Sequence, residues 1–435
     1  MKILVAHNTY QRAGGEDTVF ETECAMLVHA GHEVIKWEVH NDTIDTSNPL
    51  KAINVAIKTI WNWHSYAVMR SLIRTHHPDI VHFHNTFPLI SPSVYWACKK
   101  EDVPVVQTLH NYRLCCLNAY LFQNGSVCEK CLGKTSWRGV RYRCYRDSLS
   151  ASMTLFMMLM IHRILRTWTR KIDAYIVLTE FGRQKMIETG LPKENIFVKP
   201  NAIDMTEVQE FRSSGVQNEE ITPALLSHLS AGGELVLYAG RLSSEKGVDV
   251  LLRAWKIFTS ARRETCATLV IAGDGNERQN LEALAKRLGL TVHARSFDGG
   301  KDAATTITPF SVIFTGHLTH DHLRALRQTA AVFVVPSLWY ETFGMGIVES
   351  FAQGVPVIVS NIGGQATLVQ DGVTGWHFNT GDEANLADKL AIALSDPRRL
   401  HTMKTTVREW IAQSDSADKR NVQRLLEIYG TVIHN

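Results

Sequence analysis

Short apolar segments alternate with longer amphipathic ones through the first half of the chain. The apolar, β-branched segments predict buried strands at residues 3–6, 33–38, 80–84, 105–109 and 174–179. The amphipathic segments predict helices near residues 17–30, 50–76, 92–100 and 148–170. This alternation of strand and helix is typical of a doubly wound sheet of parallel strands.

A second series of the same kind begins after a polar, aperiodic stretch at 205–233, which we interpret as a linker. Its strands are predicted at 235–239, 268–272, 312–315 and 331–335, and its helices at 246–259, 276–288, 383–394 and 397–412. We therefore predict an α/β protein with two Rossmann-like domains that face each other across a cleft. The domains cover 1–204 and 234–415, and a last helix is predicted within 416–435.

Composition narrows the class of protein but not its activity. The chain has 435 residues, 45% of them hydrophobic and 20% charged, and a net charge of +3. These values describe an ordinary globular protein, and the charge is too small to indicate a nucleic-acid partner. The apolar start of MKILVAHN is too short for a signal peptide, and residues 153–161 are too few to span a bilayer. We therefore expect a cytoplasmic protein.

The richest stretch is PSLWYETFGMGIVESFAQGVPVIVSNIGG at 336–364. It predicts a strand end, a glycine loop through Gly344 and Gly346, and a helix whose N-terminal N–H groups can bind an anion. Glu341 precedes this helix and Glu349 lies in its first turns. Carboxylates beside a phosphate site predict a nucleotide-sugar pocket, in which Glu349 accepts hydrogen bonds from ribose and Glu341 faces the sugar. Phe343 and Met345 would line the same loop.

Other strand ends carry further candidate residues. Arg241 and Lys246 bracket a turn after the strand at 235–239, where their charges would neutralise a diphosphate, although a pair of solvated surface cations is the alternative. Gly14, Gly15 and Gly273 follow other strands, where tight turns alone would also explain them. His110 ends the strand at 105–109, at the edge of the sheet where ligands bind.

The sequence does not indicate a metal ion that would help to bind a nucleotide-sugar donor. The chain has no Asp-x-Asp pair that could chelate Mg²⁺, so Arg241 and Lys246 are its natural substitute. We expect no cofactor for catalysis.

Five of the eight cysteines crowd into an insertion at 110–147. Cys128-x-x-Cys131 with Cys144 and one of Cys115 or Cys116 has the spacing of a tetrahedral zinc site. Zinc would supply folding energy to a segment with little core, so we favour a structural zinc ion, held by Cys116, Cys128, Cys131 and Cys144. Reduced thiols in an unusual loop, or a redox-active C-x-x-C, are the alternatives.

The predicted helix at 148–170 has apolar residues at helical spacing and basic residues near its end. A core helix with a basic last turn is the simpler interpretation. A peripheral contact with a membrane surface is the alternative.

Taken together, these motifs resemble those of the retaining GT-B glycosyltransferases of family 4, the glycosyl transferases group 1. The resemblance extends over the whole chain. The cysteine-bearing insertion resembles one found in a subset of the family's bacterial members. It rests on Gly14-Gly15, His110, Pro200-Asn201, Gly240-Arg241, Lys246-Gly247, Gly273-Asp274-Gly275, the Glu341/Glu349 pair, Gly354-Val-Pro-Val-Ile, Gly363-Gly364, Asp371-Gly372 and Gly375. One departure is Thr367, where the family often has a glutamate.

The resemblance implies that the last helix, at 416–435, crosses back to the first domain, and it implies the roles of these residues. Arg241 and Lys246 would hold the donor diphosphate, Glu349 the ribose and Glu341 the donor sugar, with His110 beside the anomeric carbon. The expected donor is a UDP, GDP or dTDP sugar, and the expected acceptor is a glycan or lipid-linked glycan of bacterial surface polysaccharide synthesis. An epimerase on the same fold and a non-catalytic zinc-bearing scaffold are the alternative functions. The sequence leaves the oligomeric state open.

Overall fold

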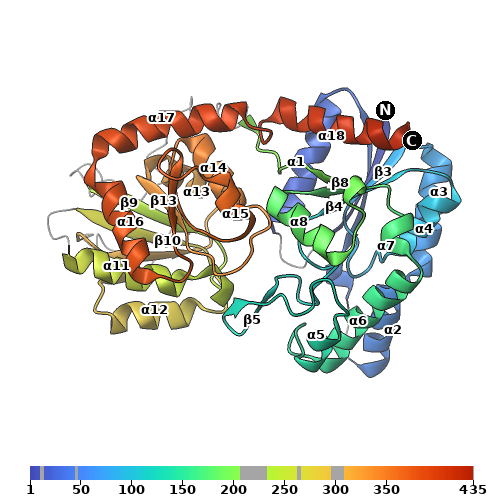
Figure 1. Ribbon diagram of the computed structural model, residues 1–435, viewed down its shortest axis with the longest axis horizontal. Coiled ribbons are helices and arrows are strands. Elements are labelled where there is room, and N and C mark those ends of the chain that lie inside the picture. The colour runs from blue at the N-terminus through green and yellow to red at the C-terminus, as the bar shows by residue number, and fades with distance from the viewer. Residues whose placement is uncertain (10–13, 45–47, 206–232, 262–265, 295–307, 435) are drawn as a thin grey trace. The chain divides into compact units, whose positions relative to one another are not determined.

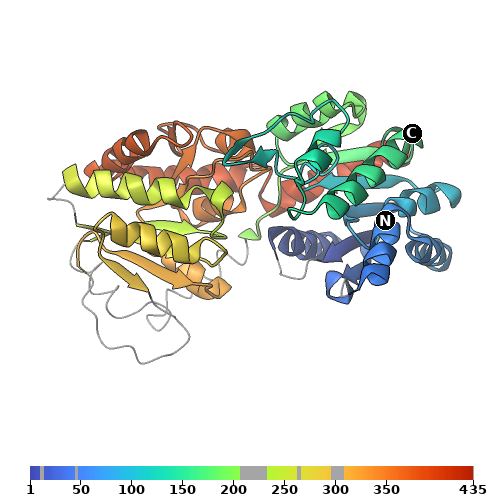
Figure 2. The same ribbon diagram turned by 90° about the horizontal axis from the view of Figure 1, so that it is seen from below.

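The computed structural model describes residues 1–434 except 10–13, 45–47, 206–232, 262–265 and 295–307. It divides into two compact units. Unit 1 comprises Met1–Gln123, Cys128–Ile203 and Asp415–Asn435, and unit 2 comprises Asn124–Val127 and Asp204–Ser414. Within each unit the strands form one layer between helices (Figure 1, Figure 2). The predicted linker at 205–233 falls almost wholly outside the described residues.

The sheet of unit 1 has six parallel strands in the order β2-β1-β3-β4-β7-β8. In chain order the strands are β1 (Lys2–Thr9), β2 (Glu33–His40), β3 (Ile80–Asn85), β4 (Val105–Leu109), β7 (Ala174–Val177) and β8 (Ile196–Val198). Two short strands, β5 (Phe122–Gln123) and β6 (Ser126–Val127), pair with each other. Because β1 lies between β2 and β3, the winding direction reverses between β1 and β3, which is where open sheets of this kind bind ligands.

The helices of unit 1 cover both faces of its sheet. They are α1 (Gly15–His29), α2 (Pro49–Ile60), α3 (Trp63–His76), α4 (Ser93–Lys100), α5 (Trp137–Arg141), α6 (Leu149–Ile164), α7 (Thr167–Arg170), α8 (Glu180–Thr189) and α18 (Asp418–Ile433). One core joins α1 and α18 to the sheet through Phe20, Ile80, Val106 and Leu425. The last helix therefore belongs to the core of unit 1.

Two predicted helices of unit 1 are wrong in detail. The helix predicted at 50–76 is broken at Trp61, since the Asn62 side chain caps a new helix by accepting from the backbone N–H groups of His64 and Ser65. The helix predicted at 148–170 ends at Ile164, because Arg166 takes a left-handed conformation, and a separate short turn follows.

Unit 2 has seven parallel strands in the order β11-β12-β10-β9-β13-β14-β15. In chain order they are β9 (Glu234–Ala239), β10 (Ala267–Ala272), β11 (Val292–Ala294), β12 (Val312–Gly316), β13 (Val332–Val335), β14 (Val357–Ser360) and β15 (Gly375–Phe378). Strands β10 and β13 flank β9, so the winding direction reverses between β9 and β13. The two richest sequence motifs follow these two strands.

The helices of unit 2 are α11 (Val248–Ala261), α12 (Arg278–Arg287), α13 (His320–Thr329), α14 (Met345–Gln353), α15 (Gly363–Leu368), α16 (Glu383–Ser395) and α17 (Pro397–Gln413). Trp255, Leu281 and Leu390 bring α11, α12 and α16 onto one face of the sheet. In the described part of the chain, no helix is long and apolar enough to cross a membrane.

Candidate active site

The loops after β9 and β13 meet in unit 2. The backbone N–H of Leu338 donates to the carbonyl of Glu245 at 2.8 Å, which ties the second loop to the first. Gly364, at the start of α15, donates its N–H to the carbonyl of Glu341 at 2.9 Å. Three separate stretches of the chain are thus joined by main-chain hydrogen bonds.

Lys246 and Glu341 form the centre of this junction. The Lys246 ammonium lies 2.5 Å from Oε1 of Glu341, although the two residues are far apart in sequence. The same oxygen accepts hydrogen bonds from Ser337 Oγ at 2.9 Å and Trp339 Nε1 at 3.0 Å. The Lys246 ammonium also lies 5.4 Å from the centre of the Trp339 ring. Since both charged side chains are largely buried, this is a strong, fixed contact.

Arg241 lies at the same turn but is half exposed. Its guanidinium donates to Glu245 Oε1 at 2.9 Å, and Ser243 Oγ donates to the same oxygen at 2.6 Å. Arg241 is therefore held near Lys246 by a buried carboxylate that was not among the residues expected from the sequence.

Two glycines of this junction are required by close backbone contacts. Gly247 has φ +65°, and a Cβ there would lie 2.1 Å from the carbonyl oxygen of Pro336. Gly273 has φ +133°, and a Cβ there would lie 2.0 Å from the carbonyl oxygen of Gly240. Both positions therefore need glycine so that the loops can approach each other.

Glu349 lies on α14, four residues after its first residue, and contacts a residue that the sequence motifs did not indicate. Its Oε2 lies 2.5 Å from the guanidinium of Arg327 on α13. The Arg327 side chain is only 6% exposed, whereas Glu349 is 26% exposed. Arg327 thus holds Glu349 from the buried side. A buried arginine in a helix of otherwise ordinary pattern carries no sequence signal for this role.

The glycine loop before α14 has the predicted form only in part. Gly344 has φ +114° and precedes the first residue of α14, Met345, while Gly346 packs on the ring of Phe333. Phe343 is 2% exposed, so its side chain belongs to the core and only its backbone can line a donor site.

In unit 1, the predicted residues after β1 and β4 lie close together. Asp17 accepts from the Gly14 N–H at 2.7 Å and contacts His7 Nε2 at 2.7 Å. Asn111 donates to Glu16 at 3.1 Å, which connects the residue after His110 to the helix opened by Gly15. The remainder of the predicted turn, at Arg12 and Ala13, lies outside the described residues.

The His110 side chain is buried, with its Nε2 3.1 Å from Nδ1 of His84 and the two rings stacked. Burial holds the pKa of His110 well below its ordinary value, helped by the neighbouring His84. Both histidines line a cavity of about 60 Å³ at the carboxyl ends of β3 and β4, with Asn85, Thr108, Asn111 and Arg113 among its other polar residues.

A charged cluster lies beneath His84. Glu23 Oε2 is 2.6 Å from the Lys199 ammonium, and Glu23 Oε1 is 2.9 Å from His84 Nε2. His82 bridges Thr108 and Tyr429 of α18. Burial would raise the pKa of Glu23, but the charges of Lys199, His84 and His82 outweigh it and hold that pKa well below the usual range. Burial lowers the pKa of His84 to about 4, so His84 is neutral at neutral pH beside the ion pair of Glu23 and Lys199.

Local spacing carries a partial signal for this cluster. His82 and His84 are two positions apart on β3 and so lie on one face of the sheet. Glu23 and Lys199 carry no such signal, because their contact joins positions 176 apart.

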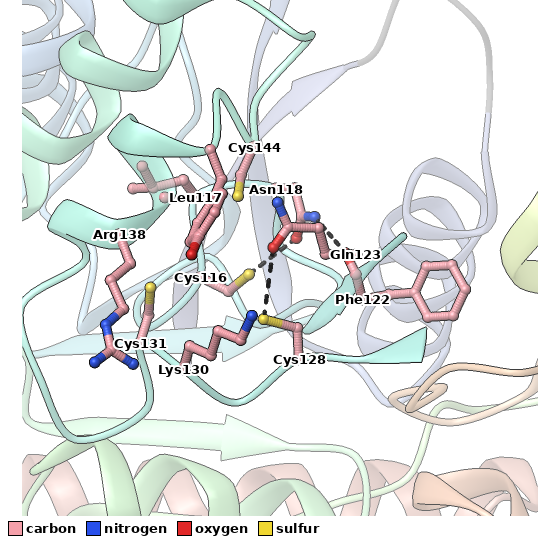
Figure 3. Close-up of a pocket in the computed structure, with 12 residues that line it drawn as sticks. Cys116, Leu117, Asn118, Phe122, Gln123, Cys128, Lys130, Cys131, Arg138 and Cys144 are labelled. Atoms are coloured by element: carbon pink, nitrogen blue, oxygen red, sulfur yellow. Dashed lines mark hydrogen bonds between the residues drawn. The ribbon is translucent and has the colours of Figure 1, made fainter. Parts of the chain in front are cut away.

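Four cysteines of the insertion line a common cavity in unit 1, and Figure 3 shows Cys116, Cys128, Cys131 and Cys144 around it. Cys115 does not line it. Its thiol donates instead to the carbonyl of Tyr112 at 3.3 Å.

Comparison with known proteins gives matches to both halves of the chain. Residues 13–207 match the family described as Glycosyltransferase Family 4, and residues 227–410 match Glycosyl transferases group 1. An uncharacterised glycosyltransferase of Methanocaldococcus jannaschii is 33% identical over 164 residues, which are 38% of this chain and 33% of that protein. Glycogen synthase of Mycobacterium tuberculosis is 35% identical over 162 residues, which are 37% of this chain and 34% of that protein. The chain thus spans about a third of the length of these two relatives.

Among solved structures, Anabaena HepE in complex with UDP-glucose superposes with a TM-score of 0.61 at 16% identity, covering 100% of both chains. At that identity the similarity establishes the fold, which is GT-B.

Proposed function

The chain belongs to the glycosyltransferases of family 4, and from this premise we propose that it transfers a sugar from a nucleotide-sugar donor to an acceptor glycan. The observation that carries the proposal is the junction of Lys246 and Glu341 where the sheet of unit 2 reverses its winding. Phosphate groups bind at such a reversal, beside helix N-termini.

In this proposal unit 2 holds the donor. Lys246 and Arg241 bind the diphosphate, Glu349 accepts from the ribose through the oxygen that Arg327 does not hold, and Glu341 accepts from the sugar hydroxyls through Oε2. The backbone around Gly273 and Gly344 to Gly346 lines the same site. The donor is a UDP sugar, with GDP and dTDP sugars as the alternatives. A neighbour of the same fold binds UDP-glucose, which supports the choice of UDP.

The transferred sugar keeps its anomeric configuration through front-face displacement, in which the departing diphosphate accepts the proton of the attacking hydroxyl. Oε1 of Glu341 already accepts from an ammonium, a hydroxyl and an indole N–H. A carboxylate stabilised in this way is a weak nucleophile, which argues against a covalent glycosyl-enzyme. The rate enhancement then comes from orientation and from the charges of Lys246 and Arg241 on the leaving diphosphate, without a metal ion.

In this proposal unit 1 holds the acceptor, beside the cavity lined by His110. His110 supports the reacting carbon through its backbone, since its imidazole is committed to His84. The acceptor is a lipid-linked glycan of bacterial surface polysaccharide synthesis, presented at the inner face of the membrane.

A surface of unit 1 suits that location. Helix α2 carries Leu50, Ile53 and Ile57, which share one helical stripe and are all more than half exposed. Helix α6 packs against α2 and α5, and it exposes Leu149, Met157 and Ile164. Residues 134–171 contain nine Lys and Arg against one Asp. Apolar residues among cations fit the surface of an anionic bilayer.

Vesicle sedimentation tests this surface. Wild-type protein should sediment with vesicles of anionic phospholipid and not with neutral ones, and Leu50→Asn/Ile53→Asn/Ile57→Asn should remain in solution. The control is Ile257→Asn/Ile392→Asn, which removes two exposed apolar residues from unit 2. Equal sedimentation of all three proteins would refute the membrane contact.

The donor is tested by thermal shift with UDP, GDP and dTDP sugars. One nucleotide should raise the unfolding temperature of the wild type and should fail to do so for Lys246→Met. Absence of any shift across the panel would refute the donor site. Product formation that needs no acceptor would instead indicate an epimerase.

A further inference from the structure

We propose that Cys116, Cys128, Cys131 and Cys144 bind one zinc ion, which fixes the segment that follows His110. The four thiols come from three separate stretches of chain and line one cavity of about 20 Å³, enough for a single small occupant. None of them forms a disulfide bond. Four thiols around a cavity of this size are the ligand set of a closed, structural zinc site.

The local backbone decides which of the two adjacent cysteines takes part. Cys115 is directed into the core, where its thiol donates to Tyr112. Cys116 faces the cavity, and its thiol donates to Asn118 Oδ1 at 2.9 Å. A tight turn follows, closed by the Ala119 N–H on the Cys116 carbonyl at 3.0 Å.

Cys128 and Cys131 belong to a compact turn of the kind that presents two thiolates to one metal ion. The N–H of Leu132 bonds the carbonyl of Glu129 at 3.0 Å, and the N–H of Lys134 bonds the carbonyl of Cys131 at 3.1 Å. Gly133 allows the sharp reversal with φ +66°. No helix begins at this C-x-x-C, which distinguishes it from a redox-active pair at a helix N-terminus.

Positively charged residues line the cavity and would balance the negative charge of a zinc–thiolate site. A zinc ion with four thiolates has a net charge of −2, and both Lys130 and Arg138 line the cavity. Hydrogen bonds to ligand atoms and nearby cations are the outer shell that a metal site needs.

Another group of possible metal ligands among the described residues is more closely spaced than the four cysteines. The ligand atoms of Glu23, His82 and His84 all lie within 4.8 Å of one another. However, the Lys199 ammonium lies 2.6 Å from Glu23 and already supplies the positive charge there. The cysteine sulfurs are more widely spaced, and zinc would draw them to about 3.8 Å apart, given Zn–S bonds of about 2.3 Å.

The zinc ion would stabilise a region with a small core of its own. That core consists of Leu117, Val140, Leu155, Met158 and Leu159. Leu117 directly follows Cys116 and packs against Gly139, where a Cβ would lie 2.7 Å from it. Binding at Cys116 and Cys144 therefore holds both sides of this contact, and with it the chain that leaves His110.

Metal analysis of purified protein tests the proposal. We expect about one zinc per chain in protein prepared without chelator, and a loss of about tenfold or more in Cys116→Ser and in Cys131→Ser. Cys115→Ser is the matched control, because it changes the neighbouring buried thiol, and it should keep its zinc. Zinc-free wild type, or loss of zinc in Cys115→Ser with retention in Cys116→Ser, would overturn the proposal.

A spectroscopic measurement on the wild type covers the case in which the serine variants do not fold. Replacement of zinc by cobalt should give thiolate-to-metal charge-transfer absorption and the visible bands of tetrahedral coordination, and X-ray absorption of the zinc form should give four sulfur ligands near 2.3 Å. A first shell of nitrogen or oxygen would overturn the cysteine assignment. So would a Cys128–Cys131 disulfide in protein purified without oxidant.

Discussion

The Lys246 ammonium contacts Glu341 in the free protein and, in the proposed donor complex, the diphosphate. Replacement of Lys246 by methionine should distinguish the contributions of these two contacts. Methionine keeps most of the aliphatic stem beside Trp339 and removes the charge that lies 2.5 Å from Glu341. Without donor, Glu341 retains its hydrogen bonds from Ser337 and Trp339. The fold should therefore lose only one charge-assisted hydrogen bond.

The expected magnitudes differ for stability and for catalysis. A hydrogen bond to a charged group contributes about 1.5–3 kcal/mol, and because two donors remain on Glu341 we expect the lower part of that range for the free energy of unfolding. Removal of a charge that stabilises the leaving phosphate should lower kcat by about 10²–10³ and raise the donor KM. Lys256→Met, on the following helix, is the control and should change neither quantity appreciably.

A double-mutant cycle with Glu341→Gln provides the decisive assay. In urea unfolding without donor, the two substitutions should couple by about 1–2 kcal/mol, since they remove opposite ends of one contact. With saturating nucleotide sugar the coupling should fall towards zero, because Lys246 then binds the diphosphate. Coupling that is unchanged by the donor, or unchanged kinetics in Lys246→Met, would refute the phosphate assignment.

Three further outcomes are expected. Arg327→Met should weaken nucleotide binding in calorimetry by about tenfold with a smaller effect on kcat, because Glu349 loses the partner that orients it; an equal loss in kcat would contradict this role. Gly247→Ala should destabilise the fold by more than about 1 kcal/mol through the contact with Pro336, whereas Gly430→Ala, with open space around its Cβ, should be neutral or slightly stabilising in the same denaturation assay. The free energy of unfolding in urea should fall as the pH drops from 6.5 towards 4, because burial keeps the pKa of His84 at about 4 in the folded protein, whereas the unfolded chain binds that proton at a higher pH. The loss from His84 is up to roughly 3 kcal/mol. Glu23, whose pKa is lowered in the folded protein, adds to the loss once the pH is below the pKa of this glutamate in the unfolded chain. A profile that is flat over this range, or one that His84→Gln leaves unchanged, would contradict the last prediction.

The sequence alone was enough to predict the two parallel sheets and the sheet edges at which the candidate site residues lie. Alternating apolar and amphipathic segments depend on local periodicity, and Arg241, Lys246, Glu341 and Glu349 lie beside glycines at strand ends. Local pattern was therefore enough to identify the loops that form the candidate site. It was not enough for the short edge strands β8, β11 and β15, since three or four residues carry too little periodicity.

Only the tertiary structure decided which side chains meet. Arg327 reaches Glu349, Lys199 neutralises Glu23, and Lys246 bonds Glu341 because packing brings distant positions together, and no local pattern encodes such a distance. Helix breaks after Ile60 and Ile164 likewise depend on an asparagine cap and on a left-handed arginine that the surrounding fold holds in place. Lys246 and the glutamates at 341 and 349 could thus be named from sequence, but the buried Arg327 that orients Glu349 could not, because burial is a property of the folded chain.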